Sequence, residues 1–157
     1  MKKTVLYFFL LLITSCIRHD SINGDFDMQY HSDDDYFKMN DASYDRLLHD
    51  SLTGVKDTSI KIVFTESEKE RVRKTLNENN FLGLPELIAG KCISPSSHTQ
   101  IFIKYEGKKK MVKYIDACDY DDKISAKKME TIISTIDSIL KTKKEIYNLP
   151  KSGFITL

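Results

Sequence analysis

Four aspartates lie close together ahead of an apolar helical stripe: Asp116, Asp119, Asp121 and Asp122. Clustered carboxylates suit Ca²⁺, which takes six to eight oxygen ligands. Counted from Asp119, an EF-hand loop needs glycine at its sixth position, where this chain has Ile124. The EF-hand match therefore fails, and a solvated loop whose acids favour the N-terminus of the next helix is the preferred interpretation. A metal- or small-ligand-binding sensor is the alternative.

His98 lies beside three hydroxyl side chains, those of Ser96, Ser97 and Thr99. Nucleophilic catalysis needs a nucleophile and a base that a third group orients, and adjacency along the chain does not supply that geometry. No GxSxG, HExxH or P-loop pattern occurs in the sequence. We therefore expect no enzymatic activity and no cofactor.

A basic run forms the third candidate site, and it alternates with aromatic residues. Inside a cell this pattern would indicate nucleic acid as a partner. Behind an export signal, the available partners are lipid headgroups, acidic polysaccharide or an acidic protein, and nucleic acid is not expected. Lysines at a hairpin tip also keep sheet edges soluble, which is the plainer interpretation. The lysines are Lys104, Lys108, Lys109, Lys110 and Lys113.

The N-terminus supplies that export signal. Lys2 and Lys3 precede an uninterrupted apolar run over 5–13, which is typical of a signal peptide and too short to span a bilayer. The following Ile13-Thr14-Ser15-Cys16 resembles the lipobox of bacterial lipoproteins. The resemblance implies that Cys16 becomes the mature N-terminus and carries a diacylglycerol and an amide-linked acyl chain, enough for a stable anchor. By the same resemblance, Ile17 after it favours the outer membrane, where we expect the domain to face the periplasm. Plain secretion is the alternative.

Two cysteines remain once Cys16 is assigned to lipid. Cys92 and Cys118 form an even pair in an oxidising compartment, so we expect a disulfide between them. The closed loop would stabilise the fold by about 3–4 kcal/mol in the chain-entropy model. Two buried free thiols or a metal pair are the alternatives, and no CxxC or His-rich spacing supports metal.

Charge and length suggest how the chain is divided. The length of 157 residues supports one domain. The net charge of +1 is the sum of an acidic N-terminal part and a basic remainder. The segment after Cys16 is rich in Asp, Ser, Asn and Gly without periodicity, which indicates a flexible tether. We therefore predict a signal peptide over 1–15, an acidic tether over 16–42 and a globular domain over 43–157.

Periodicity predicts the elements of that domain. Ile60, Ile62 and Phe64 alternate as in a strand, and Thr65 then opens a helix through about Asn79 with a capping box. Residues 101–105 and 111–115 alternate around a turn at Gly107, which predicts a hairpin. A last helix from about Ser125 carries an isoleucine-rich stripe. The sequence thus predicts an α+β fold: a small antiparallel sheet packed by two helices in a single domain.

The layout as a whole resembles small uncharacterised lipoproteins of Gram-negative envelopes. The resemblance rests on the strand followed by Thr65-Glu66-Ser67-Glu68, the stop Asn80-Phe81-Leu82-Gly83-Leu84-Pro85, and Leu149-Pro150. It implies no known activity. We expect a non-enzymatic envelope protein that binds a protein or glycan partner, and an inhibitor or immunity protein for a lytic or toxic enzyme is the specific version of this hypothesis.

Overall fold

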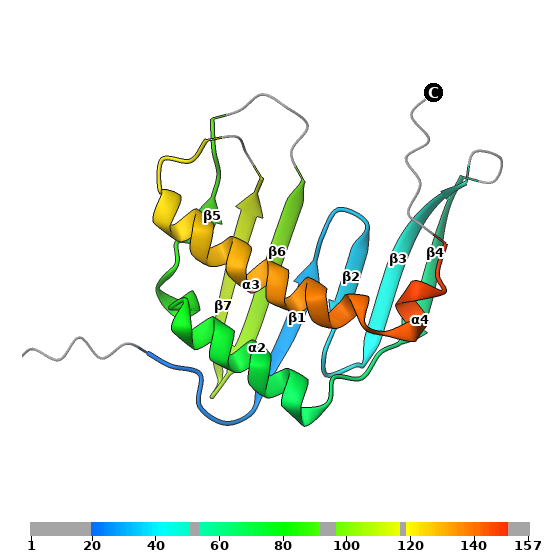
Figure 1. The fold of residues 1–157 in the computed structure, drawn as a ribbon, viewed down its shortest axis with the longest axis horizontal. Coiled ribbons are helices and arrows are strands. Elements are labelled where there is room, and N and C mark those ends of the chain that lie inside the picture. Colours follow the sequence, from blue (N-terminus) through cyan, green and yellow to red (C-terminus); the bar gives the residue numbers. More distant parts are fainter. Residues whose placement is uncertain (1–19, 51–53, 92–96, 117–118, 151–157) are drawn as a thin grey trace, which may run out of the picture.

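A mixed sheet of seven strands forms the centre of the computed structural model, which describes residues 20–50, 54–91, 97–116 and 119–150. Their order in space is β4-β3-β2-β1-β6-β7-β5, and each neighbouring pair is antiparallel except β5 with β7 (Figure 1). The predicted small antiparallel sheet is therefore wrong in its size and in one pairing. The strands are β1 (Phe26–His31), β2 (Asp35–Lys38), β3 (Ser43–Asp50), β4 (Gly54–Lys61), β5 (Leu87–Ile88), β6 (His98–Tyr105) and β7 (Lys108–Ile115).

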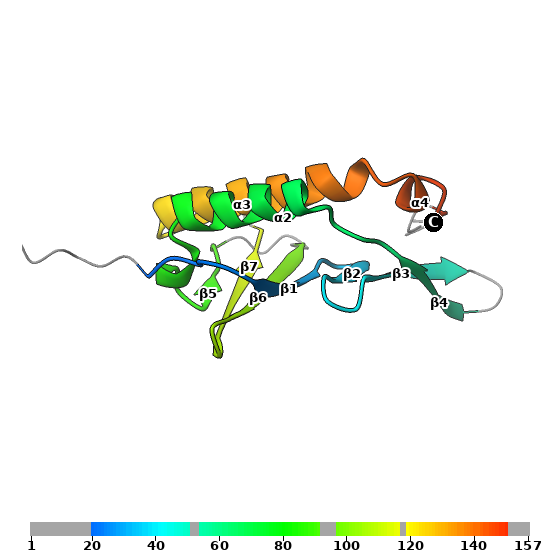
Figure 2. The ribbon, with the colours of Figure 1, turned by 90° about the horizontal axis from the view of Figure 1, so that it is seen from below.

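Two long helices lie on one face of this sheet, α2 (Glu66–Glu78) and α3 (Lys123–Lys141), as the edge-on view of Figure 2 shows. The predicted capping box of α2 is confirmed, because Thr65 accepts from the Glu68 backbone N–H and Glu68 accepts from the Thr65 backbone N–H. A short α4 (Lys144–Tyr147) follows α3, and a 3₁₀ turn (Phe81–Gly83) follows α2. No helix in the described ranges is long and apolar enough to cross a membrane.

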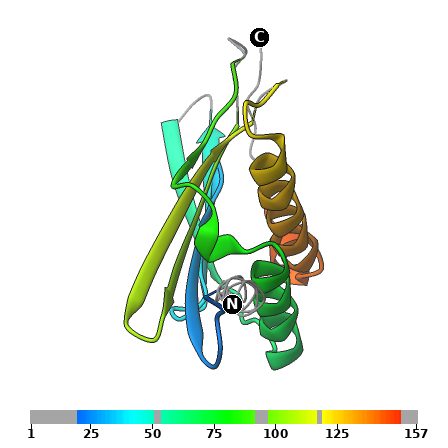
Figure 3. The same cartoon turned by 90° about the vertical axis from the view of Figure 1, so that its left-hand side faces the viewer.

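Figure 3 shows the helices and the sheet as two layers, and the buried side chains of both layers belong to one hydrophobic core. The α3 stripe predicted from its spacing is confirmed, and its isoleucines at 132, 136 and 139 are buried. Phe37 from β2 stacks on Phe64 from the β4–α2 connection, with ring centroids 4.6 Å apart. The helix layer and the sheet thus form one domain, with the helices segregated to one face in the manner of α+β folds.

The predicted hairpin around Gly107 is confirmed. Strands β6 and β7 pair from His98 opposite Ile115 to Tyr105 opposite Lys108. The two linking residues, Glu106 and Gly107, both have positive φ, 45° and 75°. A two-residue turn of this kind matches the twist of the flanking strands.

The predicted acidic tether over 16–42 is wrong for residues 20–42, which belong to the folded domain. Strand β1 lies at the centre of the sheet, between β2 and β6. Its Met28 and Tyr30 are buried, and so is Phe37 of β2. Ahead of β1, Ile22 is buried and its backbone N–H donates to Asn77 Oδ1 of α2 at 2.8 Å. Residues 16–19 lie outside the described part of the chain.

Candidate binding face on the helix-free side of the sheet

The face of the sheet away from the helices is the first feature that could receive a ligand or partner. Side chains alternate along a strand, so burial of Met28 and Tyr30 beneath the helices directs Asp27, Gln29 and His31 to the opposite face. The register then extends this face across the neighbouring strands. One row runs Met111, Phe102, Gln29 and Lys38, and the next runs Lys113, Gln100, His31, Tyr36 and Asp45.

A groove of about 680 Å³ crosses the middle of this face. Its apolar part comes from Phe102 of β6, Met111 of β7 and Leu47 of β3, together with the ring of Tyr36. Met111 is a large apolar side chain that is 49% exposed, and it lies on β7 beyond the two residues that pair with β5. The remaining lining residues are Gln29, His31, Asp34, Asp35, Asp45, Arg46 and Gln100.

The polar end of the groove carries negative charge that is not balanced locally. Asp34 and Asp45 are half-buried, and neither makes an ion pair with another residue in the described ranges. Between them lies Asp35, whose carboxylate is neutralised by Arg46. Two carboxylates near an apolar surface would attract a partner that offers a cationic group beside an apolar one.

Asp35 and Arg46 form a fixed ion pair at the end of the groove. They face each other across β2 and β3, and Arg46 donates from Nε to Asp35 Oδ1 at 2.7 Å and from Nη2 to Oδ2 at 3.1 Å. Arg46 Nη2 also donates to the Tyr44 hydroxyl at 2.6 Å. Both residues also line a smaller cavity on the helix side, so this pair separates the groove from the interior.

The five lysines proposed from sequence do not form a single surface. Lys104, Lys109 and Lys113 alternate onto the helix-free face, outside the groove. Lys108 lies at the closed end of the hairpin, and Lys110 is half-buried on the other column of β7. The structure thus places four of the lysines around the hairpin end and separates Lys113 from them.

The four aspartates of the proposed metal loop each have a different neighbour. Asp119 pairs with Lys123 at 3.0 Å, and Asp121 pairs with Lys91 at 2.5 Å. Asp122 caps α3 by accepting from the Ser125 backbone N–H at 3.0 Å, and Asp116 Oδ1 lies 3.2 Å from the Tyr120 hydroxyl. In the part of the chain that the structure describes, no three His, Cys, Asp or Glu side chains are grouped as metal ligands.

His98 lies at the end of β6 on the helix-free face. Its backbone N–H donates to Asp33 Oδ1 at 2.7 Å, and its Nδ1 lies 3.6 Å from the same oxygen. Of the hydroxyls considered with it, Thr99 is buried on the opposite face, Ser97 lines the helix-side cleft and Ser96 lies outside the described residues. The structure therefore brings His98 to a carboxylate and does not bring it to a described nucleophile.

A cleft between α3 and the ends of β6 and β7 contains buried tyrosines that sequence reasoning did not single out. The Tyr30 hydroxyl donates to Asp137 Oδ1 at 2.7 Å, and the Tyr114 hydroxyl donates to Glu130 Oε1 at 3.0 Å. Burial is the main cause that raises the pKa of both phenols well above the usual value; Asp137 adds to it for Tyr30, and the Tyr120 hydroxyl and then Glu130 add to it for Tyr114. A phenol that stays protonated and bonded to a carboxylate acts here as a structural link between sheet and helix.

Comparison with known proteins adds no relative: no family model matches the chain, and no curated protein sequence resembles it. The proposed lipidation site, Cys16, and the proposed disulfide partners, Cys92 and Cys118, lie outside the described residues. The groove residues of β1 and β2 were missed because that segment was assigned to the tether. The alternation of Phe26, Met28 and Tyr30 was the available signal.

Proposed function

We propose that this chain is a lipid-anchored protein of the bacterial envelope that binds a protein partner through the groove on its helix-free face. The observation that carries the binding role is the groove itself, an apolar surface of Phe102, Met111 and Leu47 left uncovered beside Asp34 and Asp45. Met and aromatic side chains are enriched at the centres of protein interfaces. The expected partner offers a basic side chain next to an apolar one.

A protein is favoured over a glycan by the chemistry of the groove. The rings of Phe102 and Tyr36 among polar side chains would also suit a sugar, but the flexible side chain of Met111 and the aliphatic Leu47 add apolar contacts that fit a protein side chain better. The role we propose is therefore binding without catalysis, and blocking a lytic or toxic enzyme is its most specific form. The sensor alternative has no grouped metal ligands in the described ranges to support it.

The anchor is proposed from the lipobox-like Ile13-Thr14-Ser15-Cys16. Two or more acyl chains on Cys16 would hold the protein permanently at the outer membrane, facing the periplasm. The intact mass of the full-length protein purified from membranes should include the lipid. The Cys16→Ala variant should lack that mass and leave the membrane fraction.

The disulfide proposal gains support from the residues that flank the two cysteines. Gly90 forms an antiparallel bridge with Tyr120, and the Lys91 backbone N–H donates to the Asp119 carbonyl at 3.2 Å. These contacts bring Lys91 and Asp119, the described neighbours of the two cysteines, to adjacent segments, which is consistent with a disulfide between Cys92 and Cys118.

Site-specific crosslinking in the native envelope tests the binding role. A photoreactive residue at position 111 reports on the groove, and the same residue at position 124 is a matched control, since Ile124 is 71% exposed in the helix layer. We expect one discrete adduct from position 111, which the Asp45→Asn substitution weakens. Equal adducts from both positions, or none from position 111, would contradict the proposal.

A further inference from the structure

The closed end of the β6–β7 hairpin, residues 104–110, is referred to here as the hairpin tip. It carries four lysines and one acid, Glu106, so its formal charge is +3. Lys104, Lys108 and Lys109 are exposed, and Lys110 is half-buried. Among the described residues only Asp20 pairs with any of these lysines, through Lys108 at 3.7 Å. Asp27 of β1 also lies directly opposite Lys104, so Asp20 and Asp27 offset part of this charge, and within the described ranges Lys109 and Lys110 make no ion pair.

The register of the hairpin makes this charge costly for the free domain. Lys104 and Lys109 lie directly opposite each other across β6 and β7. Like charges at directly opposite positions destabilise a strand pair, whereas an acid at either position would stabilise it. Asp27 lies opposite Lys104 on its other side, so an anion outside the domain would act chiefly at Lys109, which is exposed.

The N-terminal chain places the hairpin tip near the proposed lipid. The chain is held on α2 from Ile22 onward, because Asn77 bonds both the N–H and the carbonyl of Ile22, at 2.8 and 3.1 Å. The hairpin tip extends away from this segment in Figure 2, and the contact between them is the pairing of Asp20 with Lys108 at 3.7 Å. Cys16 precedes Asp20 by four residues, and four residues span at most about 14 Å.

We infer that the hairpin tip rests on anionic phospholipid headgroups and thereby holds the domain in one orientation on the membrane. The inference depends on the proposed lipid anchor at Cys16. A link of at most about 14 Å keeps the tip within roughly two Debye lengths of the bilayer surface, where anionic lipids attract lysine. The membrane contact then uses Lys104, Lys108, Lys109 and Lys110, and it leaves the groove between β7 and β3 open to a partner.

Amine footprinting of the full-length lipoprotein in vesicles tests this inference. The protein is placed in vesicles of phosphatidylethanolamine with phosphatidylglycerol, or with phosphatidylcholine as the neutral control, and is labelled with a membrane-impermeant amine reagent. We expect the four tip lysines to be labelled about five-fold more slowly on the anionic vesicles, and high salt to remove the difference. Lys127 and Lys144, in the helix layer, should be labelled equally on both.

A pair of matched variants separates lipid contact from general charge effects. The tip variant replaces the four tip lysines by glutamine. The helix-layer variant replaces Lys127, Lys128, Lys141 and Lys144 by glutamine. Amide hydrogen exchange over 104–110 should slow on anionic vesicles for the native chain and the helix-layer variant, but not for the tip variant. Equal labelling of the tip lysines on both kinds of vesicle would overturn the inference. Protection of these lysines in native envelopes but not on anionic vesicles would also overturn it, because the tip would then be covered by an acidic protein.

The two proposals fail in different ways. If the protein does not float with vesicles of either composition, and its mass lacks lipid, the anchor at Cys16 is wrong and the orientation inference falls with it. If the protein floats with both and the tip lysines react equally, the anchor stands and only the orientation is wrong.

Discussion

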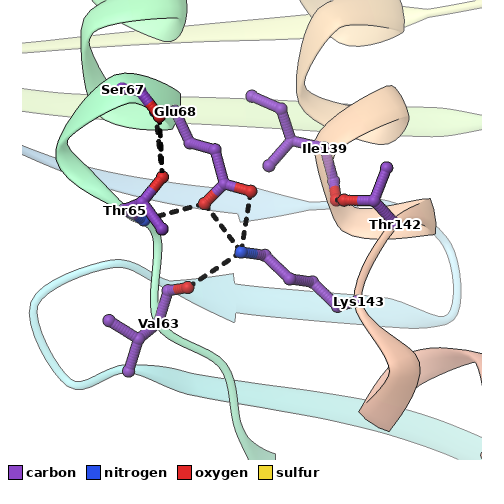
Figure 4. Close-up of polar contacts among 7 residues, drawn as sticks. All are labelled: Val63, Thr65, Ser67, Glu68, Ile139, Thr142 and Lys143. Atoms are coloured by element: carbon purple, nitrogen blue, oxygen red, sulfur yellow. Dashed lines mark hydrogen bonds and ion pairs between the residues drawn. The ribbon is translucent and has the colours of Figure 1, made fainter.

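Lys143 and Glu68 join parts of the chain that are far apart in sequence. Lys143 Nζ donates to both carboxylate oxygens of Glu68, at 2.8 and 2.7 Å, and to the Val63 carbonyl at 2.9 Å (Figure 4). Glu68 also accepts from the Thr65 backbone N–H that it caps. The side chains are only 14% and 22% exposed. One ammonium group therefore fixes the start of α2, the end of the β4 connection and the break between α3 and α4.

Replacing this lysine should destabilise the domain. Lys143→Met retains the apolar stem and removes all three hydrogen bonds, and we expect the free energy of unfolding to fall by about 1–2 kcal/mol, since partial exposure limits the contribution of an ion pair. Urea unfolding measures the change. Lys144→Met is the matched control, because Lys144 is exposed and should change stability by less than about 0.5 kcal/mol. Equal effects of the two substitutions would contradict the role of Lys143.

The same contact predicts an acid dependence. Burial alone would raise the pKa of Glu68, but hydrogen bonds from Lys143 and Thr65 outweigh it and the pKa lies below its usual value. The folded state thus binds the proton more weakly than the unfolded state. The stabilisation is present above about pH 4.3 and is lost as the pH falls through the folded pKa. The stability gap between the native chain and Lys143→Met should therefore narrow at pH 3, and a constant gap would refute this account.

The sequence was sufficient to predict those elements whose signals lie within a few neighbouring residues. Thr65 with Glu68, the alternation around Gly107 and the spacing of the isoleucines in α3 each predict an element without reference to the rest of the fold. Capping, turn conformation and helical periodicity depend on residues a few positions apart. These elements were therefore predictable, and the structure confirms them.

The size of the sheet was not predicted because the polar composition of residues 20–42 obscures the alternation of apolar side chains in β1 and β2. Aspartates occupy the turns and the open face around β1 and β2, so the segment reads as polar overall. Three of the ten residues in β1 and β2 are nevertheless buried apolar side chains, namely Met28, Tyr30 and Phe37. The groove could not be predicted either, since it depends on β6 pairing with β1, whose residues are about 70 positions away.

The correction of the tether can be tested by mutation. Ile22→Ala should lower the free energy of unfolding by about 2–4 kcal/mol, because Ile22 is 1% exposed and its removal leaves a cavity beside α2. Ser21→Ala is the neighbouring control and should be nearly neutral, since Ser21 is exposed. In a flexible tether the two substitutions would be equally silent.

Alkaline pH should unfold the domain as its buried tyrosines ionise. Burial first, then nearby carboxylates, raises the pKa of Tyr30, Tyr44 and Tyr114. Their protonated forms stabilise the fold below the unfolded pKa of about 10, and this stability is lost as the pH rises toward the folded values. Phenolate absorbance from these three should therefore appear together with the loss of circular dichroism.

A phenylalanine substitution measures the contribution of one of these hydroxyl groups. Tyr30→Phe should cost about 1 kcal/mol at pH 7, because Asp137 loses its donor, and should also weaken the alkaline dependence. Tyr147→Phe is the control, since Tyr147 is 86% exposed. If all the phenols titrate in the folded state near their usual pKa, the proposed links between sheet and helix are not formed in solution.

The disulfide proposed between Cys92 and Cys118 makes the stability of the domain redox-dependent. Gly90 and Tyr120, each two residues from a cysteine, form an antiparallel bridge, and closing the 92–118 loop should stabilise the fold by about 3–4 kcal/mol. We expect no free thiol in the denatured, unreduced protein once Cys16 is lipidated. Reduction should lower the urea midpoint, and Cys92→Ala with Cys118→Ala should reproduce the reduced midpoint and be insensitive to reductant. Two titratable thiols in protein isolated from the envelope would show that the cysteines are free there, and the bridge proposal would be wrong.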